Sequence, residues 1–296
     1  MSVARGKPVH GWLLTSPYIV HTIAFFILPA LWSLALIVSR WNLISPQRDF
    51  VGIGNLREAI TSPRVWNALL VSYRFLAIIV PTVMIGSLIL ALITNALPYG
   101  KSLFAVGYFL PYLSSGVAVS VVVRGLIGFS SPINVFLRRT TGSSPNWLGD
   151  PTLATIVISG MIVWKLAGYY ALIFLAGLQG IPRQVYEAAQ IDGASSWRQL
   201  WSITLPMLYP SMYTVLILAV GIMFAIFTEP YTLTAGGPQG ATQTWQLEIY
   251  YQAFERFRAG YGSTVALLNA VTTFLSILII RRIMEAIGSR WGYEVT

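Results

Sequence analysis

Apolar stretches of membrane-spanning length dominate this chain and restrict what it can fold into. A helix needs about 20 apolar residues to cross a hydrocarbon core of about 30 Å. The stretches that approach or exceed this length are residues 11–39, 66–97, 102–123, 152–178, 207–227 and 263–280. Because a helix satisfies its own backbone hydrogen bonds within lipid, they predict an all-α polytopic membrane protein with six transmembrane helices.

The composition is typical of the same class. Hydrophobic residues make up 55% of the 296 residues, and charged residues only 10%. The net charge of +9 is typical of basic flanks beside spanning helices rather than of a nucleic-acid-binding surface. The chain has no cysteine, which excludes disulfides, thiolate metal sites and cysteine nucleophiles.

The charged residues do not orient the predicted helices. An even number of spans places both termini on the same side of the membrane. However, Lys and Arg occur in nearly equal numbers on the two sides of the predicted spans. The positive-inside rule therefore favours neither orientation.

Polar connections divide the chain unevenly. Residues 40–64 separate the first span from the others, and we expect an external strap there with a short helix over residues 55–61. We therefore treat residues 1–65 as an N-terminal arm, a first transmembrane helix and this strap. Residues 66–296 form a five-helix core, which contains a polar segment at residues 182–206.

The polar segment 182–206 is predicted to form two short helices joined by an elbow. Pro182 suits a first helical position, and Gly193 suits a left-handed C-cap that ends the first helix. Ser196–Gln199 fits a capping box at the start of a second helix. That helix carries an apolar stripe of Trp197, Leu200, Trp201 and Leu205. Lipid does not tolerate so polar a segment, so we expect it on one face of the membrane.

The sequence contains no recognisable catalytic or metal-binding pattern. The segment GKS at residues 100–102 lacks the earlier glycine of a phosphate-binding loop, because Asn95 occupies that place. His10 and His21 are not accompanied by clustered carboxylates. We therefore expect no catalytic residue, no metal site and no cofactor bound by this chain, which disfavours a membrane-embedded enzyme.

The polar segment resembles a known family motif. Glu187-Ala188-Ala189, Gly193 and Ile203-x-Leu205-Pro206 match the EAA pattern, EAA-x3-G-x9-I-x-LP. This pattern marks the membrane (permease) subunits of binding-protein-dependent ATP-binding-cassette importers. The strings EAAQIDGASSWRQLWSITLPMLYPS, YTLTAGGPQGATQT, IYYQAF and GYGSTVAL resemble the carbohydrate branch of that family, in particular its maltose-type first permease subunit. One departure follows Phe227, where Thr228 stands in place of the aspartate of many relatives.

The resemblance implies a location and a set of partners. It places segment 182–206 in the cytoplasm as a coupling-helix loop, with both termini of this multi-pass protein on the cytoplasmic side of the bacterial inner membrane. The implied partners are a second homologous permease subunit, two ATP-binding-cassette ATPase subunits that bind ATP and Mg, and a periplasmic or lipid-anchored solute-binding protein.

The resemblance also implies roles for individual residues in the loop. The chain itself hydrolyses nothing in this scheme, and the ATPase subunits drive alternating access through the loop. The residues implied in coupling to the ATPase are Glu187, Ala188, Ala189, Asp192, Gly193, Ala194, Leu205 and Pro206.

A charge in the middle of the fourth predicted span points to the substrate path. Lys165 lies beside Trp164, and a charge held in lipid is costly. Snorkelling of Lys165, or its pairing with a neighbouring subunit, is equally compatible with the sequence. The resemblance places substrate contacts in the middles of the third, fourth and fifth spans, where this chain has Tyr112, Ser115, Trp164, Lys165, Tyr169, Met223 and Phe227.

The substrate class stays open at the level of sequence. Lys165 and the arginines of the predicted outer loops favour an acidic sugar such as a uronate oligosaccharide over a neutral one, although nearby acids cancel most of that charge. Glycerol phosphate or another small solute of the same importer family is an alternative. An ion-coupled secondary transporter, from another class, would need carboxylates in its spans, and the predicted spans contain none.

Overall fold

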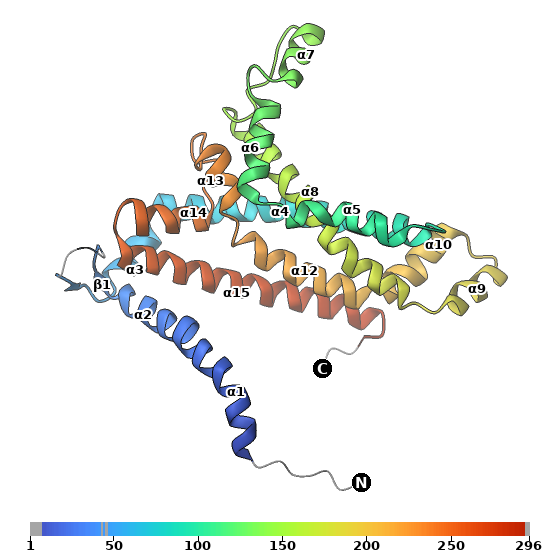
Figure 1. The fold of residues 1–296 in the computed structure, drawn as a ribbon, viewed down its shortest axis with the longest axis horizontal. Helices are drawn as coiled ribbons and strands as arrows, with labels where there is room; N and C mark the ends of the chain where they lie inside the picture. Colours follow the sequence, from blue (N-terminus) through green and yellow to red (C-terminus); the bar gives the residue numbers. More distant parts are fainter. Residues whose placement is uncertain (1–7, 43, 45–46, 294–296) are drawn as a thin grey trace. The chain divides into compact units, whose positions relative to one another are not determined.

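The computed structural model describes residues 8–42, 44 and 47–293, and these are largely helical (Figure 1). The chain divides into two compact units. Unit 1 comprises Met1–Val65 and Glu248–Leu268, and unit 2 comprises Trp66–Leu247 and Asn269–Thr296. The sequence predicted that residues 66–296 form the functional five-helix core. That assignment of function stays a prediction.

Unit 1 begins with a long apolar helix that is interrupted once. The elements up to the start of unit 2 are α1 (Pro8–Thr22), the π-helical turn η1 (Ile23–Ile27), α2 (Leu28–Ile37), β1 (Ser39–Arg40), β2 (Asp49–Phe50) and α3 (Gly54–Thr61). The π turn lies just before Pro29, whose missing N–H and bulky ring disturb the α-helical hydrogen bonds. The single irregularity of this helix therefore coincides with Pro29.

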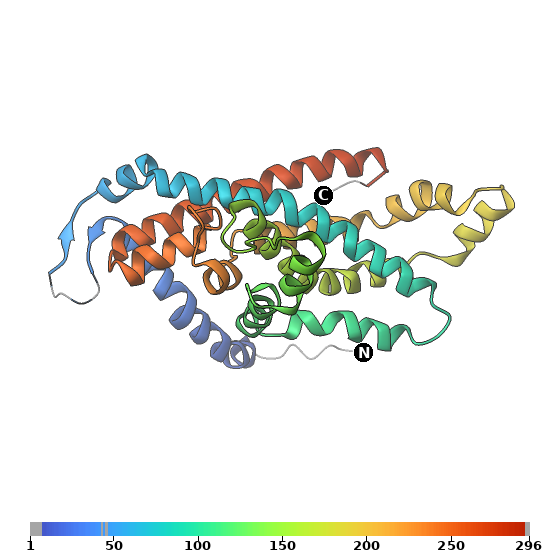
Figure 2. The same ribbon diagram turned by 90° about the horizontal axis from the view of Figure 1, so that it is seen from above.

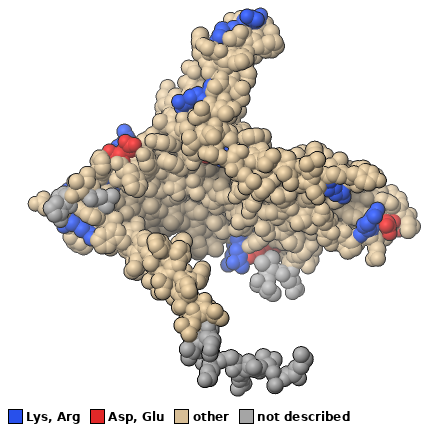
Figure 3. Space-filling model, viewed as in Figure 1, with Lys and Arg blue, Asp and Glu red and all other residues tan. Residues whose placement is uncertain are grey.

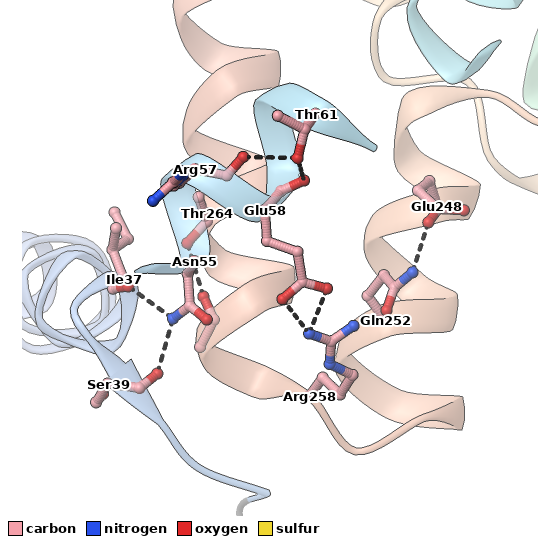
Figure 4. Close-up of polar contacts among 11 residues, drawn as sticks. Ile37, Ser39, Asn55, Arg57, Glu58, Thr61, Glu248, Gln252, Arg258 and Thr264 are labelled. Carbon is pink, nitrogen blue, oxygen red and sulfur yellow. Dashed lines mark hydrogen bonds and ion pairs between the residues drawn. The ribbon is translucent and has the colours of Figure 1, made fainter. Parts of the chain in front are cut away.

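The strap after the first helix is held by polar contacts within unit 1. Strands β1 and β2 pair antiparallel, with Ser39 opposite Phe50. The short helix predicted over residues 55–61 is α3, and its Asn55 side chain donates to the carbonyl oxygens of Ile37 at 2.8 Å and Ser39 at 2.9 Å (Figure 4). These bonds anchor the start of α3 against the end of the first span.

The rest of the chain contains the long helices and several short ones. In order they are α4 (Pro63–Ala96), α5 (Lys101–Leu113), α6 (Gly116–Ile127), α7 (Pro132–Thr141), α8 (Pro151–Gln179), α9 (Arg183–Ile191), α10 (Ser196–Gln199), η2 (Leu200–Thr204), α11 (Leu205–Met207), α12 (Tyr209–Met223), α13 (Thr228–Thr234), α14 (Trp245–Tyr250), η3 (Tyr251–Glu255) and α15 (Ala259–Arg290). Here η2 and η3 are π-helical turns.

Among the described residues, five helices are long and apolar enough to cross a membrane. They cover Trp12–Ile37, Pro63–Ala96, Gly116–Thr141, Pro151–Gln179 and Ala259–Arg290. A sixth span is obtained if the pair Ser196–Met207 and Tyr209–Met223, bent by 66°, counts as one. The expected class, an all-α polytopic membrane protein, is confirmed.

The third predicted span is wrong as a continuous helix over residues 102–123. Helix α5 ends at Leu113, two residues after Pro111, and Ser114 and Ser115 adopt extended ψ angles of 142° and 127° before α6 begins. At about 1.5 Å per residue, α5 is only ~20 Å long, too short for the hydrocarbon core. The apolar composition of this stretch did not indicate that the helix is interrupted.

The fifth predicted span, residues 207–227, also differs from a single straight helix. Its regular part is α12, Tyr209–Met223, and the chain bends between α11 and α12 at Leu208. Pro206 and Pro210 flank this bend and each lacks a backbone donor, which favours an interruption there. After Met223 the chain leaves the helix and starts the short helix α13.

Small residues let the helices of unit 2 pack closely. A Cβ atom at Gly168 of α8 would clash with the backbone carbonyl of Tyr108 in α5, and α5 packs along α8 (Figure 1). A Cβ at Gly177 would likewise meet Ser211 of α12. Around these contacts lies an apolar core whose fully buried side chains include Phe75, Ile79, Ile158, Tyr170, Phe174 and Val215.

The outer surface is mostly uncharged, as expected of a protein in lipid. Figure 3 shows that charged side chains on one face gather in a few places, among them the regions of α7 and α9. The spanning helices expose large apolar side chains instead, such as Phe25 and Trp32 of the first helix and Phe274 and Ile279 of α15. In lipid these side chains stay on the surface without a cost.

Candidate functional site

The polar segment 182–206 folds into two helical pieces joined at Gly193. Helix α9 ends with Gly193 in the left-handed region, at a φ of 75°. The N–H of Ala194 donates to the carbonyl of Ala189 at 2.9 Å, and the N–H of Gly193 to that of Gln190 at 3.0 Å. This is the Schellman pattern of helix termination. The left-handed C-cap predicted at Gly193 is confirmed, and Figure 2 shows the elbow between α9 and α10.

Two predicted helix starts are wrong by one residue. Pro182 is the N-cap of α9, with an extended ψ of 133°, and not its first helical residue. Ser195, and not Ser196, caps α10 and accepts a hydrogen bond from the N–H of Arg198 at 3.4 Å. The third residue after this cap is an arginine, so no capping box forms; Gln199 instead donates to the carbonyl of Ala194 at 2.8 Å.

The two pieces of the segment are also tied to each other. The hydroxyl of Tyr186 in α9 lies 3.0 Å from the hydroxyl of Thr204, which is buried at the end of η2. This contact joins the two arms of the elbow, and the Schellman bonds fix the end of α9 at the corner. The segment is therefore an ordered elbow held by hydrogen bonds rather than a slack loop.

The tied segment presents large apolar side chains at its surface. Trp197 is 68% exposed and Trp201 is 56% exposed, and their rings meet edge to face at 5.7 Å. Ile191, at the end of α9, is 87% exposed. The predicted stripe is partly confirmed, because its two tryptophans lie on this surface while Leu200 and Leu205 are half-buried. Exposed apolar patches rimmed by polar residues mark interaction surfaces.

The predicted coupling residues are all located in this segment. Glu187, Ala188, Asp192 and Gly193 are exposed, and Ala189, Ala194, Leu205 and Pro206 are half-buried. The structure thus brings them to one elbow, while their role toward an ATPase stays a prediction.

A buried ion pair forms the second feature of unit 2. Lys165, the central residue of α8, places its Nζ 2.9 Å from Oε1 of Glu229 in the first turn of α13. The two side chains are 16% and 12% exposed. The partly buried lysine provides a partner that makes burial of the Glu229 carboxylate tolerable. Lys165 pairs within its own chain and does not snorkel.

The ion pair lies where two interrupted helices meet. A Cβ atom added to Gly116, the first residue of α6, would lie 3.0 Å from Thr228, 3.1 Å from Oε1 of Glu229 and 3.2 Å from Nζ of Lys165. The start of α6 and the start of α13 therefore approach the middle of α8 together. A larger residue at position 116 would force these neighbours to shift.

Arg124, eight residues after Gly116 on α6, holds the same two helices together at the other end of α13. Its guanidinium donates to the carbonyl oxygens of Thr232 at 2.5 Å and Leu233 at 2.7 Å, at the end of α13. A cation at a helix C-terminus is favoured by the orphan carbonyls and the helix dipole. Arg124 therefore links α6 to the end of α13.

A small cavity adjoins the ion pair. Its volume is about 160 Å³, and Lys165, Glu229 and Phe227 contribute to its lining together with apolar side chains such as Ile162, Leu166, Ile222 and Ile226. The Phe227 ring stacks on that of Tyr231, with centroids 5.1 Å apart. The cavity thus combines one donor–acceptor pair with apolar walls and one aromatic face.

The predicted path residues fall into separate groups. Lys165 and Phe227 line the cavity, and Ser115 directly precedes Gly116 at the helix break. Tyr112 and Tyr169 stack on each other elsewhere on α5 and α8, with centroids 4.5 Å apart. Met223 is buried and Trp164 is 53% exposed, and neither is part of the cavity lining.

Gly116, Glu229 and Arg124 belong to this site but were not predicted from the sequence. Glu229 gave one usable signal: it is the carboxylate that follows the fifth apolar stretch most closely. Its 64-residue separation from Lys165 left the pairing invisible to any local pattern. Among the described residues, no cluster of three or more His, Asp or Glu side chains is placed to hold a metal ion.

The fold and these features define a polytopic helical membrane protein with an exposed elbow at Gly193 and an ion pair at its helix breaks. The family described as "Binding-protein-dependent transport system inner membrane component" matches residues 51–293, and the chain belongs to this family.

Similar proteins cover almost the whole chain. The lactose transport system permease protein LacF of Rhizobium radiobacter is 35% identical, over 95% of this chain and 97% of its own. The trehalose/maltose transport system permease protein MalF of Thermococcus litoralis is 31% identical over 88% of each chain. The multiple sugar-binding transport system permease protein MsmF of Streptococcus mutans is 30% identical, over 92% of this chain and 94% of its own.

Solved structures show the same fold. A chain of a bacterial ABC transporter involved in the import of the acidic polysaccharide alginate matches 94% of this chain and 97% of its own, with a TM-score of 0.78 and 22% identity. The bacterial alginate ABC transporter in complex with an alginate pentasaccharide-bound periplasmic protein matches with a TM-score of 0.79 and 21% identity, over 95% of this chain and 96% of that one. At such identities the likeness concerns the fold.

Proposed function

We propose that this chain is the permease subunit of an ATP-driven importer that carries a sugar or oligosaccharide across the bacterial inner membrane by alternating access. The names of its relatives, which transport lactose, trehalose and maltose, or multiple sugars, support the substrate class. In this proposal a solute-binding protein delivers the substrate, and a second homologous permease subunit completes the pathway. Two ATPase subunits bind ATP and Mg, and this chain hydrolyses nothing itself.

The observation that carries the proposal is the tied elbow at Gly193. A segment that transmits motion must be stiff within itself and must offer a surface to its partner. The Schellman bonds and the Tyr186–Thr204 contact supply the first property, and the exposed Trp197 and Trp201 supply the second. We infer that ATPase closure moves this elbow as a rigid body and reorients the helices that continue from it.

Roles for the elbow residues follow from this proposal. Glu187, exposed on α9, pairs with a basic group of the ATPase, and Ala188 and Ala189 permit close approach of the two surfaces. Leu205-Pro206 leads the chain toward α12, and Asp192 and Ala194 flank the elbow. The elbow then lies in the cytoplasm, which places both chain termini there as well.

The substrate path in this proposal runs past the middle of α8. Lys165 and Phe227 at the cavity are its best-supported members, and Tyr112 and Tyr169 offer a second aromatic surface. A uronate oligosaccharide and glycerol phosphate are the acidic substrates that the lysine alone would favour. The pairing of Lys165 with Glu229 removes the free positive charge on which that preference depended.

An ion-coupled secondary transporter is the competing function, and one observation favours it. The Lys165–Glu229 pair places a carboxylate against the centre of a spanning helix, so the lack of such groups no longer argues against ion coupling. ATP dependence separates the two functions. The complete complex is reconstituted in liposomes with wild-type ATPase or with an ATPase that cannot hydrolyse ATP. The proposal expects uptake of lactose or maltose only with the active ATPase, and uptake that persists with the inactive form would contradict it.

A further inference from the structure

The Lys165–Glu229 pair has no net charge when both groups are ionised, and this restricts what it can bind. Nζ and Oε1 lie 2.9 Å apart, and both side chains are at least five-sixths buried. Together they present one strong donor and one strong acceptor side by side at the wall of the cavity. A ligand that offers an acceptor and a donor at the same spacing satisfies both groups without separating them.

The cavity beside the pair has the size of a single ring. Its volume is about 160 Å³. An engineered protein cavity of about 150 Å³ binds benzene, so one six-membered ring is the scale of ligand that such a volume accepts. The Phe227 ring forms part of the wall, and its stack on Tyr231 keeps it in place. A ring with apolar C–H faces and polar edges matches these walls.

We propose that this site selects neutral sugar rings that carry two adjacent hydroxyl groups, and that it discriminates against uronates and sugar phosphates. One hydroxyl accepts a hydrogen bond from the Lys165 ammonium, and its neighbour donates to the Glu229 carboxylate. The ring face packs on Phe227. This inference rests on the proposed function, and it reverses the preference for acidic sugars that the sequence alone suggested.

An anionic substrate is disfavoured by the same geometry. To bind Lys165, a carboxylate or phosphate has to displace Glu229, which leaves a buried carboxylate without its partner, or else lie beside it and be repelled. Gly116 adds a constraint, because the start of α6 lies close to both charged groups and leaves them little room to separate. A neutral diol requires no such separation.

The test compares neutral and anionic probes in the complete complex reconstituted in liposomes. The probes are lactose, maltose and galacturonate oligosaccharides, and the measurement is ATP-dependent uptake with its KM and maximal rate. We expect the wild type to take up at least one neutral sugar and to prefer it over the uronate probe at least tenfold. In Glu229→Gln the lysine is uncompensated, so the neutral-to-anionic ratio falls at least tenfold. Lys101→Met, which removes a lysine at the start of α5, leaves the ratio unchanged.

Each outcome bears on a separate statement. Variants are compared only if they co-purify with the partner subunits. Phe227→Leu is a second test of the site that leaves both charges intact. We expect it to raise the KM for the neutral sugar about tenfold. A wild-type preference for the uronate, or a ratio unchanged in Glu229→Gln, overturns the inference while sugar import stands. Absence of ATP-dependent uptake of every sugar would instead contradict the proposed function.

Discussion

Gly193 shows how one residue sets the geometry of a whole segment. Its φ of 75° lies in the left-handed region, and a Cβ atom there would meet nothing within 4 Å. Any effect of a larger side chain therefore comes from backbone strain, which is about 1–2 kcal/mol for an L-residue in this region. A substitution at position 193 therefore tests the effect of backbone strain without that of a steric collision.

We predict that Gly193→Val uncouples ATP hydrolysis from transport. Valine disfavours the left-handed conformation and opens the elbow, so sugar uptake per ATP hydrolysed should fall about tenfold while the subunits still co-purify. Gly193→Asn is the matched control, since asparagine tolerates this conformation, and it should retain most of the coupling. Equal coupling in the valine variant and the wild type would contradict the rigid elbow.

Gly116 is the second residue at which the missing Cβ matters, here for steric reasons. Alanine would bring a Cβ to within 3.2 Å of Thr228, Glu229 and Lys165, and overpacking of this kind costs about 1–3 kcal/mol. We predict that Gly116→Ala lowers the maximal rate of sugar uptake about tenfold. Gly160→Ala on α8 is the control, because a Cβ there meets nothing within 4 Å, and its uptake should equal that of the wild type.

At the scale of elements, α13 depends on a clamp from another helix. It has only 7 residues, too few to be stable by itself in water. Arg124 of α6 holds its last carbonyls, and the ion pair with Lys165 holds its first turn. Two charged contacts at opposite ends thus fix the helix that carries Glu229.

We predict that Arg124→Met loosens α13 and lowers sugar uptake. A hydrogen bond from a charged group contributes about 1.5–3 kcal/mol, so loss of the clamp should reduce uptake about tenfold. Arg139→Met on α7 removes an arginine without touching α13 and serves as the control. The unfolding temperature of the purified complex should fall in Arg124→Met only. If both variants have the same unfolding temperature, Arg124 is not what holds α13.

The elements that sequence predicts best are those with long uninterrupted apolar composition. Helices α4, α8 and α15 were expected because length and hydropathy decide whether a helix crosses lipid. The break between α5 and α6 was not predicted, because it depends on a tertiary contact: Gly116 approaches Lys165 and Glu229. The elbow could be predicted because glycine and serine carry local cap signals; the C-cap at Gly193 was correct, and the two helix starts were off by one residue.

At the scale of the whole molecule, the proposed function makes the surface of the elbow the place where the ATPase subunits assemble. Trp197 and Trp201 are exposed in the isolated chain, and burial against a binding partner would remove their apolar surface from water. We predict that Trp197→Ala with Trp201→Ala reduces co-purification of the ATPase subunits at least tenfold, because buried aromatic residues dominate interface energetics. Trp12→Ala is the control: Trp12 is also 68% exposed, on the first spanning helix. Unchanged co-purification in the double variant would place the ATPase contact elsewhere.

The Lys165–Glu229 pair also has a consequence for how the protein is made. The two residues are 64 positions apart, so the ribosome synthesises the lysine well before its partner. At roughly 5–20 residues per second, α8 exists for roughly 3–13 s before Glu229 is added. A lysine at the centre of a single helix costs about 2.5–3.5 kcal/mol to insert. The apolar residues of α8 have to offset this cost, and contact with the insertion machinery or with other helices would lower it until α13 arrives to neutralise the charge.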